Sequence, residues 1–358
     1  MSLIFIDGCD RDPVKRGWVS IAGQVDHATP GVQRFPAGGK KAYTASMSRN
    51  ESAWRHTVPA PFPTEFYIGF AYYPDQLSGN SPICYISDAA TGQGLLQLYH
   101  QRGADELRLT SWATGSEAEV AISTGAGVLM GNWSFIEIGV KLDPANGWIR
   151  VRTQGNDEPC INVAGKTTRG AMESASVGSI TFVEYIAAHS GQEGHYFLDD
   201  IYMVSGDGTA PSGFIGDCRI ETALPISDLT PNEWVPSAGS DHFAMVDDPV
   251  SDNDGTYVQT TDINKREMFG FGSILTEVPD QIHGVAVNYE VRKTNAGNTR
   301  TAAVLKSGDT TAVGTGHASL SSYVTRQHAW GRNPNGNVPW TQSTIAQIAA
   351  GFESQGTG

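Results

Sequence analysis

The composition of this 358-residue chain is that of a folded protein, with 39% hydrophobic and 17% charged residues. Its length favours two or three domains with well-filled cores. The net charge of −14 argues against nucleic acid as the main partner, because binding phosphates requires a basic surface. No apolar run approaches the length that crosses a bilayer, and residues 1–7 lack the basic and long apolar regions of a signal peptide. We therefore expect no membrane partner, and synthesis in a cytosol without export.

The four cysteines, Cys9, Cys84, Cys160 and Cys218, lie far apart and form no Cys-x-x-Cys pair. Because that paired spacing is typical of zinc sites, the cysteines do not predict a metal. We expect four separate buried thiols. A disulfide stays open for a protein that functions outside a cell, and the sequence does not choose its partners.

Alternating apolar residues mark the strands of the first half. In residues 65–73, the side chains from Phe66 to Tyr72 at every second position share one face. The clearest predicted hairpin joins residues 134–142 and 148–152 through the turn Asp143-Pro-Ala-Asn-Gly147. Further strands are expected at residues 94–99, 106–112 and 179–186. Many short strands without a convincing helix favour a β-sandwich over an α/β fold.

The strand at residues 196–204, Tyr-Phe-Leu-Asp-Asp-Ile-Tyr-Met-Val, is apolar on both faces. We expect it in the middle of a sheet, as the last strand of its domain, with material packed over both sides. Strict alternation places Tyr196, Leu198, Tyr202 and Val204 on one face, and Phe197, Ile201 and Met203 on the other.

Asp199 and Asp200 interrupt this strand, one on each face, so they cannot act together on one bond. A carboxylate among so many apolar side chains needs hydrogen bonds or an ion pair. We predict that both are structural, and that at least one accepts hydrogen bonds from backbone N–H groups of a neighbouring loop or strand end.

The Gly/Pro-rich residues 206–212 are typical of a hinge. The spacing Phe-Ile-x-x-Cys that begins at Phe5 returns at Phe214, so we expect a second domain to start at Gly213. There, residues 282–291 and 300–305 are expected to pair as strands. The spacing of Ile345, Ile348, Ala349 and Phe352 predicts a short helix within residues 341–352, with Ser343 or Thr344 as its cap and Gly351 as its stop.

These patterns predict an all-β chain of two β-sandwich (jelly-roll-like) domains in tandem, with one short C-terminal helix. The expected boundaries are residues 1–205 for the first sandwich, 206–212 for the hinge and 213–358 for the second sandwich.

Several of these motifs together resemble a known group of proteins. Phe5-Ile-Asp-Gly-Cys-Asp10, the following Trp18, the closing Leu198-Asp-Asp-Ile-Tyr202 and the later Asp254-Gly-Thr-Tyr-Val258 are similar to concanavalin A-like (laminin G-like) domains of tailed-phage virion proteins. The resemblance implies a lectin-like jelly roll and a structural or tail role. The chain departs from the pattern at Cys9 and at Cys218, where an aromatic and an aliphatic residue are expected.

No catalytic residue and no cofactor is predicted. Glycoside hydrolases of similar fold carry Glu-x-Asp-x-x-Glu or Glu-x-Asp-x-Glu on one strand, and neither spacing occurs here. Glu137 stands alone among apolar neighbours, and its outward phase predicts an ordinary solvent-facing residue. Gly165-Lys-Thr167 is not a phosphate loop, because Cys160 stands where the first glycine of that motif would fall.

No metal site is predicted either. His189, His195 and Asp199 lie near one another in sequence, and residues 247–254 are rich in carboxylates. Histidines with structural roles are the favoured interpretation of the first group. A solvated turn is the favoured interpretation of the second, because the spacing and closing Glu of an EF-hand are missing.

Aromatic side chains offer candidate sugar contacts. Trp112 and Trp148 are the residues that we expect to contact a glycan, and Trp330 is a further candidate. Trp148 is outward in phase, although a covering segment of the sandwich would explain it equally well.

We therefore expect a non-enzymatic phage virion protein, a tail, fibre or capsid-decoration component. The second domain would attach it to the particle, and the lectin-like domain would serve adhesion or particle stabilisation. Its expected partners are other virion proteins, in an oligomeric assembly, and a host surface glycan. A carbohydrate-active enzyme (depolymerase) and a free sugar-binding module stay open as alternatives, and the missing acid pair counts against the enzyme.

Overall fold

The computed structural model describes residues 3–9, 17–22, 26–27, 34, 43–45, 52–76, 80–101, 105–112, 116–123, 125–169, 175–184, 195–206, 208, 210–249 and 251–356. The fold is all-β, as predicted, and the described residues contain one short α-helix. All strand pairs among them are antiparallel. The chain forms two compact units and passes from the first to the second between Ile220 and Glu221.

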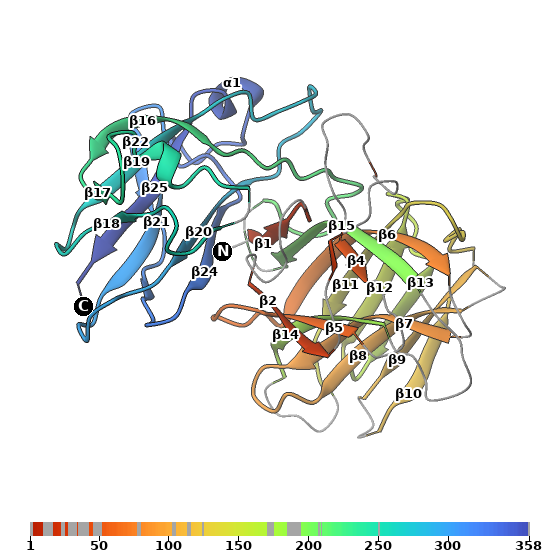
Figure 1. The fold of residues 1–358 in the computed structure, drawn as a ribbon. Helices are drawn as coiled ribbons and strands as arrows, with labels where there is room; N and C mark the ends of the chain where they lie inside the picture. The colour runs from red at the N-terminus through yellow and green to blue at the C-terminus, as the bar shows by residue number, and fades with distance from the viewer. Residues whose placement is uncertain are drawn as a thin grey trace. The chain divides into compact units, whose positions relative to one another are not determined.

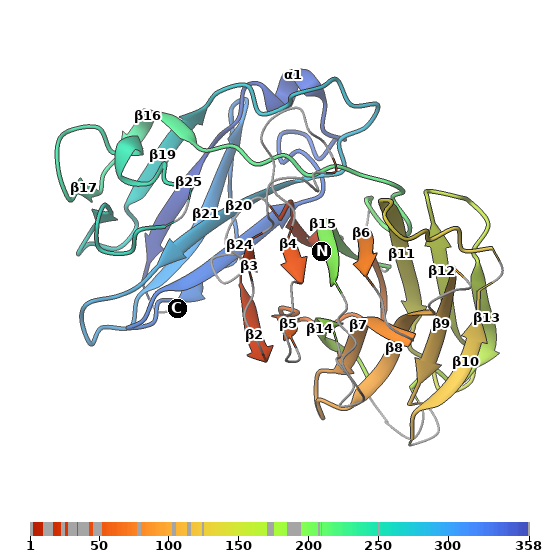
Figure 2. The ribbon, with the colours of Figure 1, turned by 45° about the vertical axis from the view of Figure 1, so that its right-hand side comes forward.

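Two sheets form the layers of the first unit (Figures 1 and 2). The eight-stranded sheet contains, in order, β13 (Ile161–Lys166), β12 (Gly147–Thr153), β11 (Ser134–Lys141), β6 (Glu65–Gln76), β15 (His195–Ser205), β4 (Tyr43–Ala45) and β3 (Asp26–His27), and β1 (Leu3–Asp7) also pairs with β15. The seven-stranded sheet contains, in order, β10 (Ala118–Ile122), β9 (Glu106–Ser111), β8 (Gly94–Gln101), β7 (Asn80–Asp88), β14 (Val177–Glu184), β5 (Ser52–Thr57) and β2 (Trp18–Ala22).

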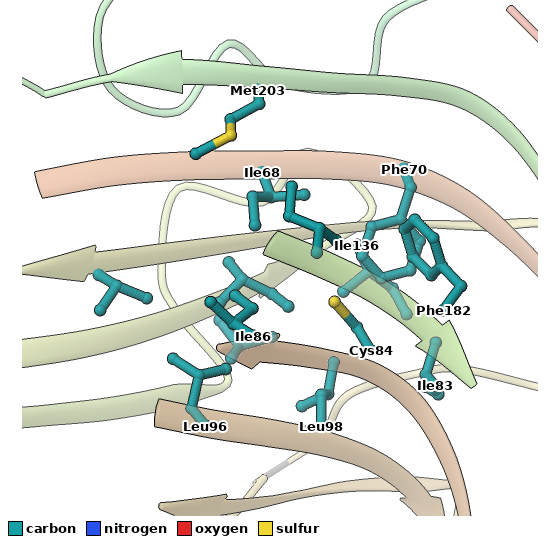
Figure 3. Close-up of a cluster of buried hydrophobic side chains, with 14 of the residues drawn as sticks. Ile68, Phe70, Ile83, Cys84, Ile86, Leu96, Leu98, Ile136, Phe182 and Met203 are labelled. Carbon is teal, nitrogen blue, oxygen red and sulfur yellow. The ribbon is translucent and has the colours of Figure 1, made fainter. Parts of the chain in front are cut away.

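The core of the first unit lies between these sheets. Figure 3 shows apolar side chains from both layers meeting there, among them Ile68, Phe70, Ile136 and Met203 of the eight-stranded sheet and Ile86, Leu98 and Phe182 of the seven-stranded sheet. Each is essentially inaccessible to solvent, and burying such a side chain contributes about 1.5–3 kcal/mol. Phe66, Phe70 and Tyr72 face this core, as the alternation of residues 65–73 predicts.

The predicted hairpin at residues 134–152 is confirmed. β11 pairs with β12 in a regular register that sets Ile138 opposite Val151. Asp143 holds the connecting turn, because its Oδ1 accepts hydrogen bonds from the N–H groups of Ala145 (2.9 Å) and Asn146 (2.7 Å). The side-chain period and the turn residues therefore agree with the observed structure.

β15 lies inside its sheet and is buried on both faces, as predicted, but its two faces are not those that strict alternation gives. Tyr196, Leu198, Ile201 and Met203 all face the core. The register with β6 shifts between Asp199 and Tyr202, and Asp200 has a φ of 50°. This β-bulge inserts a residue, so every side chain after it changes face.

The boundary expected at residues 206–212 is displaced by the structure. The compact first unit continues to Ile220, so residues 213–220 belong to it and do not open a second sandwich. The next strand, β16, starts only at Pro225. The repeated Phe-Ile-x-x-Cys spacing does not mark two domain starts, because both copies lie in the first unit.

The second unit is built on a six-stranded sheet. It contains, in order, β16 (Pro225–Asn232), β19 (Arg266–Phe271), β25 (Ala349–Gln355), β21 (Arg300–Ser307) and β22 (Thr310–Val313), and β23 (His317–Ala318) also pairs with β21. Two further pairs are β17 (Val235–Pro236) with β18 (Val258–Gln259), and β20 (Val285–Val291) with β24 (Val324–Trp330). Leu305 and Ala350 of the large sheet pack in one cluster with Val285, Val287 and Trp330 of the β20–β24 pair. The remaining elements are the 3-10 helix η2 (Phe243–Met245) and the helix α1 (Gln342–Ile345).

Two predictions for the second unit are wrong in detail. β21 does not pair with β20, because β20 pairs with β24 and β21 lies between β25 and β22. The C-terminal helix exists, but it ends at Ile345, and its cap is Thr341, whose side chain accepts from the N–H of Thr344. Of the residues expected to continue it, those from Ala349 to Phe352 belong to β25 in the middle of the sheet.

Among the described residues, no helix combines the length and the apolar character needed to cross a membrane.

Candidate functional site

On the outer face of the eight-stranded sheet, residues 213–220 of the same unit cover part of β6, β11, β12 and β15. Glu137 on β11, expected to face solvent, is only 1% exposed. Its Oε1 accepts a hydrogen bond from the N–H of Gly216 (2.8 Å) and another from the hydroxyl of Tyr202. The outward phase of Glu137 was predicted correctly, but its exposure was not, because the covering segment lies almost eighty residues further along the chain.

The β15 bulge fixes the end of this covering segment. Asp200 is 2% exposed, and its Oδ1 accepts a hydrogen bond from the N–H of Ile220 (2.7 Å). Its Oδ2 accepts from Arg34 Nη1 (2.7 Å), and the same nitrogen donates to the carbonyl of Cys218 (2.9 Å). Burial alone lowers the pKa of Arg34, but the carboxylates of Asp200 and Asp217 raise it above its usual value. The neighbouring Asp199 accepts from the N–H of Asp200 (2.8 Å).

Trp148 lies on this same covered side of the sandwich. Its ring is half-buried, 5.7 Å from the ring of Tyr67, with the guanidinium of Arg150 above it at 4.9 Å. Tyr67 in turn meets Phe214 of the covering segment edge to face at 4.9 Å. Trp148 therefore adjoins, through Tyr67, the part of this face that the covering segment fills.

On the outer face of the seven-stranded sheet, Tyr85, Gln97 and Glu119 remain accessible, whereas Thr110 and Thr181 are buried. The strand registers align Thr181, Tyr85, Gln97, Thr110 and Glu119 in one row across β14, β7, β8, β9 and β10. Their neighbours along each strand, such as Leu98 and Leu109, face the core. The row therefore points away from the core.

Trp112, the residue after β9, completes this face. Its ring meets Tyr85 edge to face, with centroids 5.5 Å apart and planes at 83°. Both side chains are half-exposed. A Cβ at Gly94 would lie 2.7 Å from the Trp112 ring and 2.8 Å from the Tyr85 hydroxyl, so the indole covers a position that only glycine allows. The two rings form a corner on the surface, which we call the Trp112–Tyr85 corner.

Further hydrogen-bonding groups lie on the strands next to the corner. The Tyr99 hydroxyl lies 2.9 Å from Gln97 Oε1 and 2.7 Å from Glu117 Oε1. Burial, and then the hydrogen bond to Glu117, raise the pKa of Tyr99, so its phenol stays protonated at neutral pH. Arg108 Nε is paired with Glu119 Oε2 at 2.7 Å, and both side chains are substantially exposed. This face thus combines aromatic rings with an amide, hydroxyls, carboxylates and a guanidinium.

The two tryptophans predicted to contact a glycan are therefore separated. Trp112 belongs to the open face of the seven-stranded sheet, and Trp148 to the opposite side of the sandwich. The sequence analysis did not single out Tyr85, Gln97 and Tyr99. A signal for the last two was present, since residues 96–99, Leu-Gln-Leu-Tyr, alternate core leucines with outward polar or aromatic residues.

The other candidates have structural partners or lie outside the described residues. His189 is among the residues that the structure does not describe, and of His195 it describes the backbone alone. Nowhere in the described ranges do three or more His, Cys, Asp or Glu side chains gather as a metal site. In the turn at residues 247–254, Asp254 Oδ1 accepts from Arg292 and Tyr323, each at 2.6 Å. Trp330 packs in the core of the second unit.

All four cysteines are free thiols. Cys9 and Cys84 are buried, whereas Cys160 and Cys218 are half-buried. Burial raises the pKa of Cys84 far above its usual range. That thiol therefore stays protonated, as a small apolar core residue does.

A buried carboxylate also organises the second unit. Glu267 on β19 is fully buried, and its Oε2 accepts from the N–H groups of Glu233 (3.0 Å) and Trp234 (2.8 Å). Its Oε1 lies 2.6 Å from His242 Nδ1. Burial raises the pKa of Glu267, while these partners oppose that shift. Because both oxygens are occupied, the group connects strands and loops and does not face a ligand.

The first unit is thus a two-sheet antiparallel β-sandwich, and the outer face of its seven-stranded sheet carries accessible aromatic and polar side chains. No protein-family model matches the sequence, and no curated protein matches it significantly.

Similar solved structures include a galectin-like protein of unknown function from Bacillus subtilis, with 9% identity and a TM-score of 0.40 over 57% of this chain and 96% of that one. Lectin II from Ulex europaeus aligns with 10% identity and a TM-score of 0.37, covering 56% of this chain and 97% of the lectin. A carbohydrate esterase from the Shiga toxin-encoding bacteriophage phi24B aligns with 10% identity and a TM-score of 0.36, covering 53% of this chain and 90% of the esterase. What this chain binds has to be inferred from its own residues.

Proposed function

We propose that the first unit is a carbohydrate-binding module that uses the outer face of its seven-stranded sheet. The observation that carries this proposal is the Trp112–Tyr85 corner, two half-exposed rings with Gln97 directly opposite Tyr85 in the strand pairing. A pyranose ring has a C–H face that packs on an aromatic surface, and hydroxyl groups that need fixed hydrogen-bonding partners. A surface with rigid aromatic contacts and a few placed polar groups supplies both.

We also propose that the protein binds this glycan without cleaving it. Hydrolysis of a glycosidic bond requires two carboxyl groups that flank the bond, one of them a general acid. On the open face, Glu119 is paired with Arg108 and Glu117 is bonded to Tyr99. On the covered face, Glu137 and Asp200 hold the backbone of residues 213–220.

Catalysis is tested by incubating the full chain with capsule and cell-wall polysaccharides and measuring reducing ends. We expect no release above that of heat-denatured protein. Release that disappears in Glu137→Gln while the variant remains folded would overturn the non-enzymatic proposal in favour of a depolymerase.

The sequence resemblance to tailed-phage virion domains supports a further part of the proposal, that a phage particle carries this module. In that setting the second unit attaches to other virion proteins in several copies, and the first unit contacts the host surface. Quantitative mass spectrometry of purified particles tests this directly. We expect a fixed copy number per particle, and absence of the protein from intact particles would refute the virion role.

Binding itself is tested with matched tryptophan variants of the full chain. A glycan array identifies ligands, and calorimetry then compares Trp112→Ala with Trp148→Ala. Both residues are half-buried and belong to opposite faces of the same sandwich, so Trp148→Ala is a matched control for Trp112→Ala. We expect Trp112→Ala to weaken binding about tenfold or more, and Trp148→Ala to leave it within about twofold. The reverse order would place the site on the covered side, and no binding to any glycan would refute the proposal.

A further inference from the structure

Charges of both signs lie near the Trp112–Tyr85 corner. Arg108 is neutralised by Glu119 at 2.7 Å. Tyr85 lies within electrostatic reach of both Arg55 and Glu117, which act on its phenol in opposite directions, while burial raises its pKa. An anionic ligand at the corner would be attracted by Arg55 and repelled by Glu117. The whole chain carries a net charge of −14. Because charges of both signs lie near the corner and the chain is negative overall, the charge distribution does not select for an acidic sugar.

The hydrogen-bonding groups at the corner match hydroxyl groups. Gln97 Oε1 is within hydrogen-bond distance of Tyr99. Among the described residues, no hydrogen bond of the Gln97 amide nitrogen is found, so its N–H groups are available beside the rings. An amide N–H donates to a hydroxyl oxygen, which in turn donates to a neighbouring acceptor. Neutral donors and acceptors of this kind suit the hydroxyl rim of a sugar.

Gly94 determines the shape of the corner. A side chain at this position would push against the fused rings of Trp112 and the hydroxyl of Tyr85, both closer than 3.0 Å to a Cβ. Because the strand backbone fixes Gly94, the indole would have to move. Gly94 is thus a positioning residue, which acts on a ligand only through Trp112 and Tyr85.

We infer that the Trp112–Tyr85 corner binds a neutral hexopyranosyl residue, whose C–H face packs on the indole of Trp112 and whose hydroxyl groups accept from the amide of Gln97. This inference rests on the proposed function and narrows it to uncharged glycans. Gly94 belongs to the same site as the residue that keeps the indole in place.

The test compares two ligand classes on the full chain. Neutral tetrasaccharides of glucose, galactose and mannose form one arm, and tetragalacturonate forms the other, each measured by calorimetry at 50 mM and 500 mM NaCl. We expect binding of at least one neutral ligand, changed less than about twofold by salt, since no charge pair contributes. Tetragalacturonate should bind at least about tenfold more weakly than that ligand.

Variants separate this inference from the proposed function. Gly94→Ala should weaken neutral binding about tenfold, while Gly139→Ala, in an equally crowded position on the covered face, should leave the affinity within about twofold. Arg55→Gln should also leave it within about twofold. Saturation-transfer NMR should show the strongest transfer to ring C–H protons on one face of the sugar.

Each contrary outcome has a distinct meaning. Salt-sensitive binding of tetragalacturonate that is lost in both Trp112→Ala and Arg55→Gln would refute the neutral class and keep the carbohydrate module. Neutral binding that is unaffected by Gly94→Ala and Trp112→Ala in folded protein would refute the corner as the site. Absence of binding to either arm, and to the wider array, would refute both proposals.

Discussion

On each outer face of the first unit a glycine lies beneath an aromatic pair. On the eight-stranded sheet, a Cβ at Gly139 would lie 2.8 Å from both Phe214 and Tyr67, whose rings meet edge to face. On the seven-stranded sheet, Gly94 occupies the same kind of position beneath Trp112 and Tyr85. Phe214 comes from the segment that covers its sheet, whereas Trp112 directly follows a strand of its own sheet and stays half-exposed.

The difference shows how similar residues serve stability on one face and recognition on the other. The covered face combines its rings with buried carboxylates, Glu137 and Asp200, which bind backbone N–H groups of the covering segment. The open face combines its rings with exposed pairs such as Arg108 with Glu119. Buried charged groups without partners are too costly to persist, while exposed ones contribute little to folding. Substitutions on the covered face should therefore lower stability, whereas substitutions on the open face should mainly weaken ligand binding.

Removing the cover should have the largest effect. A fragment ending at Ser205 lacks residues 213–220 and leaves Glu137, Asp200 and Arg34 without their partners from that segment, whereas a fragment ending at Ile220 retains them. We expect the longer fragment to unfold cooperatively in differential scanning calorimetry. The shorter one should melt about 10 °C lower or aggregate. Equal melting of the two fragments would contradict the assignment of residues 213–220 to the first unit.

Asp200→Ala should have the next largest effect, because it leaves the guanidinium of Arg34 buried with only part of its pairing and strands the N–H of Ile220. Losing one partner of a buried pair costs about 3–5 kcal/mol. The first unit should melt roughly 10 °C lower by calorimetry, and the transition of the second unit should be unchanged.

Asp200→Asn is the matched control, since asparagine tolerates the positive φ of 50° and keeps an acceptor. The melting temperature of its first unit should lie between those of wild type and Asp200→Ala. A double Asp199→Asn, Asp200→Asn variant that melts like wild type but loses a bound metal or glycan would show that these carboxylates serve a ligand.

A pH dependence should come from the core side of the seven-stranded sheet. His100 on β8 is 1% exposed, and burial lowers its pKa to about 4, against an opposing effect of Asp105. The unfolded chain takes up a proton near pH 6.5, whereas the folded protein does so only near pH 4. Stability is therefore fully present above about pH 6.5 and lost as the pH falls toward 4, by roughly 3 kcal/mol.

Urea unfolding of wild type and His100→Gln at several pH values measures this loss. The difference in unfolding free energy between the two proteins should change by roughly 3 kcal/mol between about pH 6.5 and pH 4. A difference that does not vary with pH would show that His100 has the same pKa in the folded protein as in the unfolded chain.

The smallest effects on the unfolding free energy are expected from two isosteric substitutions, one of a carboxylate on each face. Glu137→Gln weakens charge-assisted hydrogen bonds at a buried position and should cost about 1.5–3 kcal/mol. Glu119→Gln breaks an ion pair in which the carboxylate is 45% exposed, and should cost about 1 kcal/mol or less. Chemical denaturation measures both, and equal costs would remove the distinction between a covered and an open face.

The sequence predicted best what depends on neighbouring residues. Alternation and the Asp143 turn were sufficient for the hairpin of β11 and β12, because both its register and its inward residues follow from local spacing. Gln97 and Tyr99 were equally accessible to that reasoning, since they occupy the outward positions of an alternating strand.

What the sequence analysis missed depends on contacts that are distant along the chain. The bulge at Asp200 is held by Arg34 and by the N–H of Ile220. Because both partners are distant along the chain, no local sequence pattern predicts the bulge. Likewise, the apolar spacing up to Phe352 predicts a helix, but residues 349–352 form a strand because β25 pairs with both β19 and β21. Gly351 there allows a close approach, since a Cβ would meet Glu267 O at 1.8 Å.

Hydroxyl-radical footprinting tests the central claim most directly, because it reports the solvent exposure of individual side chains. Trp112 and Trp148 are both half-exposed in the free protein and should be oxidised at measurable rates. At a saturating concentration of the neutral glycan that binds, the account predicts strong protection of Trp112 and Tyr85 and unchanged oxidation of Trp148 and Tyr67. Protection of Trp148 and Tyr67, with Trp112 and Tyr85 unchanged, would contradict the account and place recognition on the covered face.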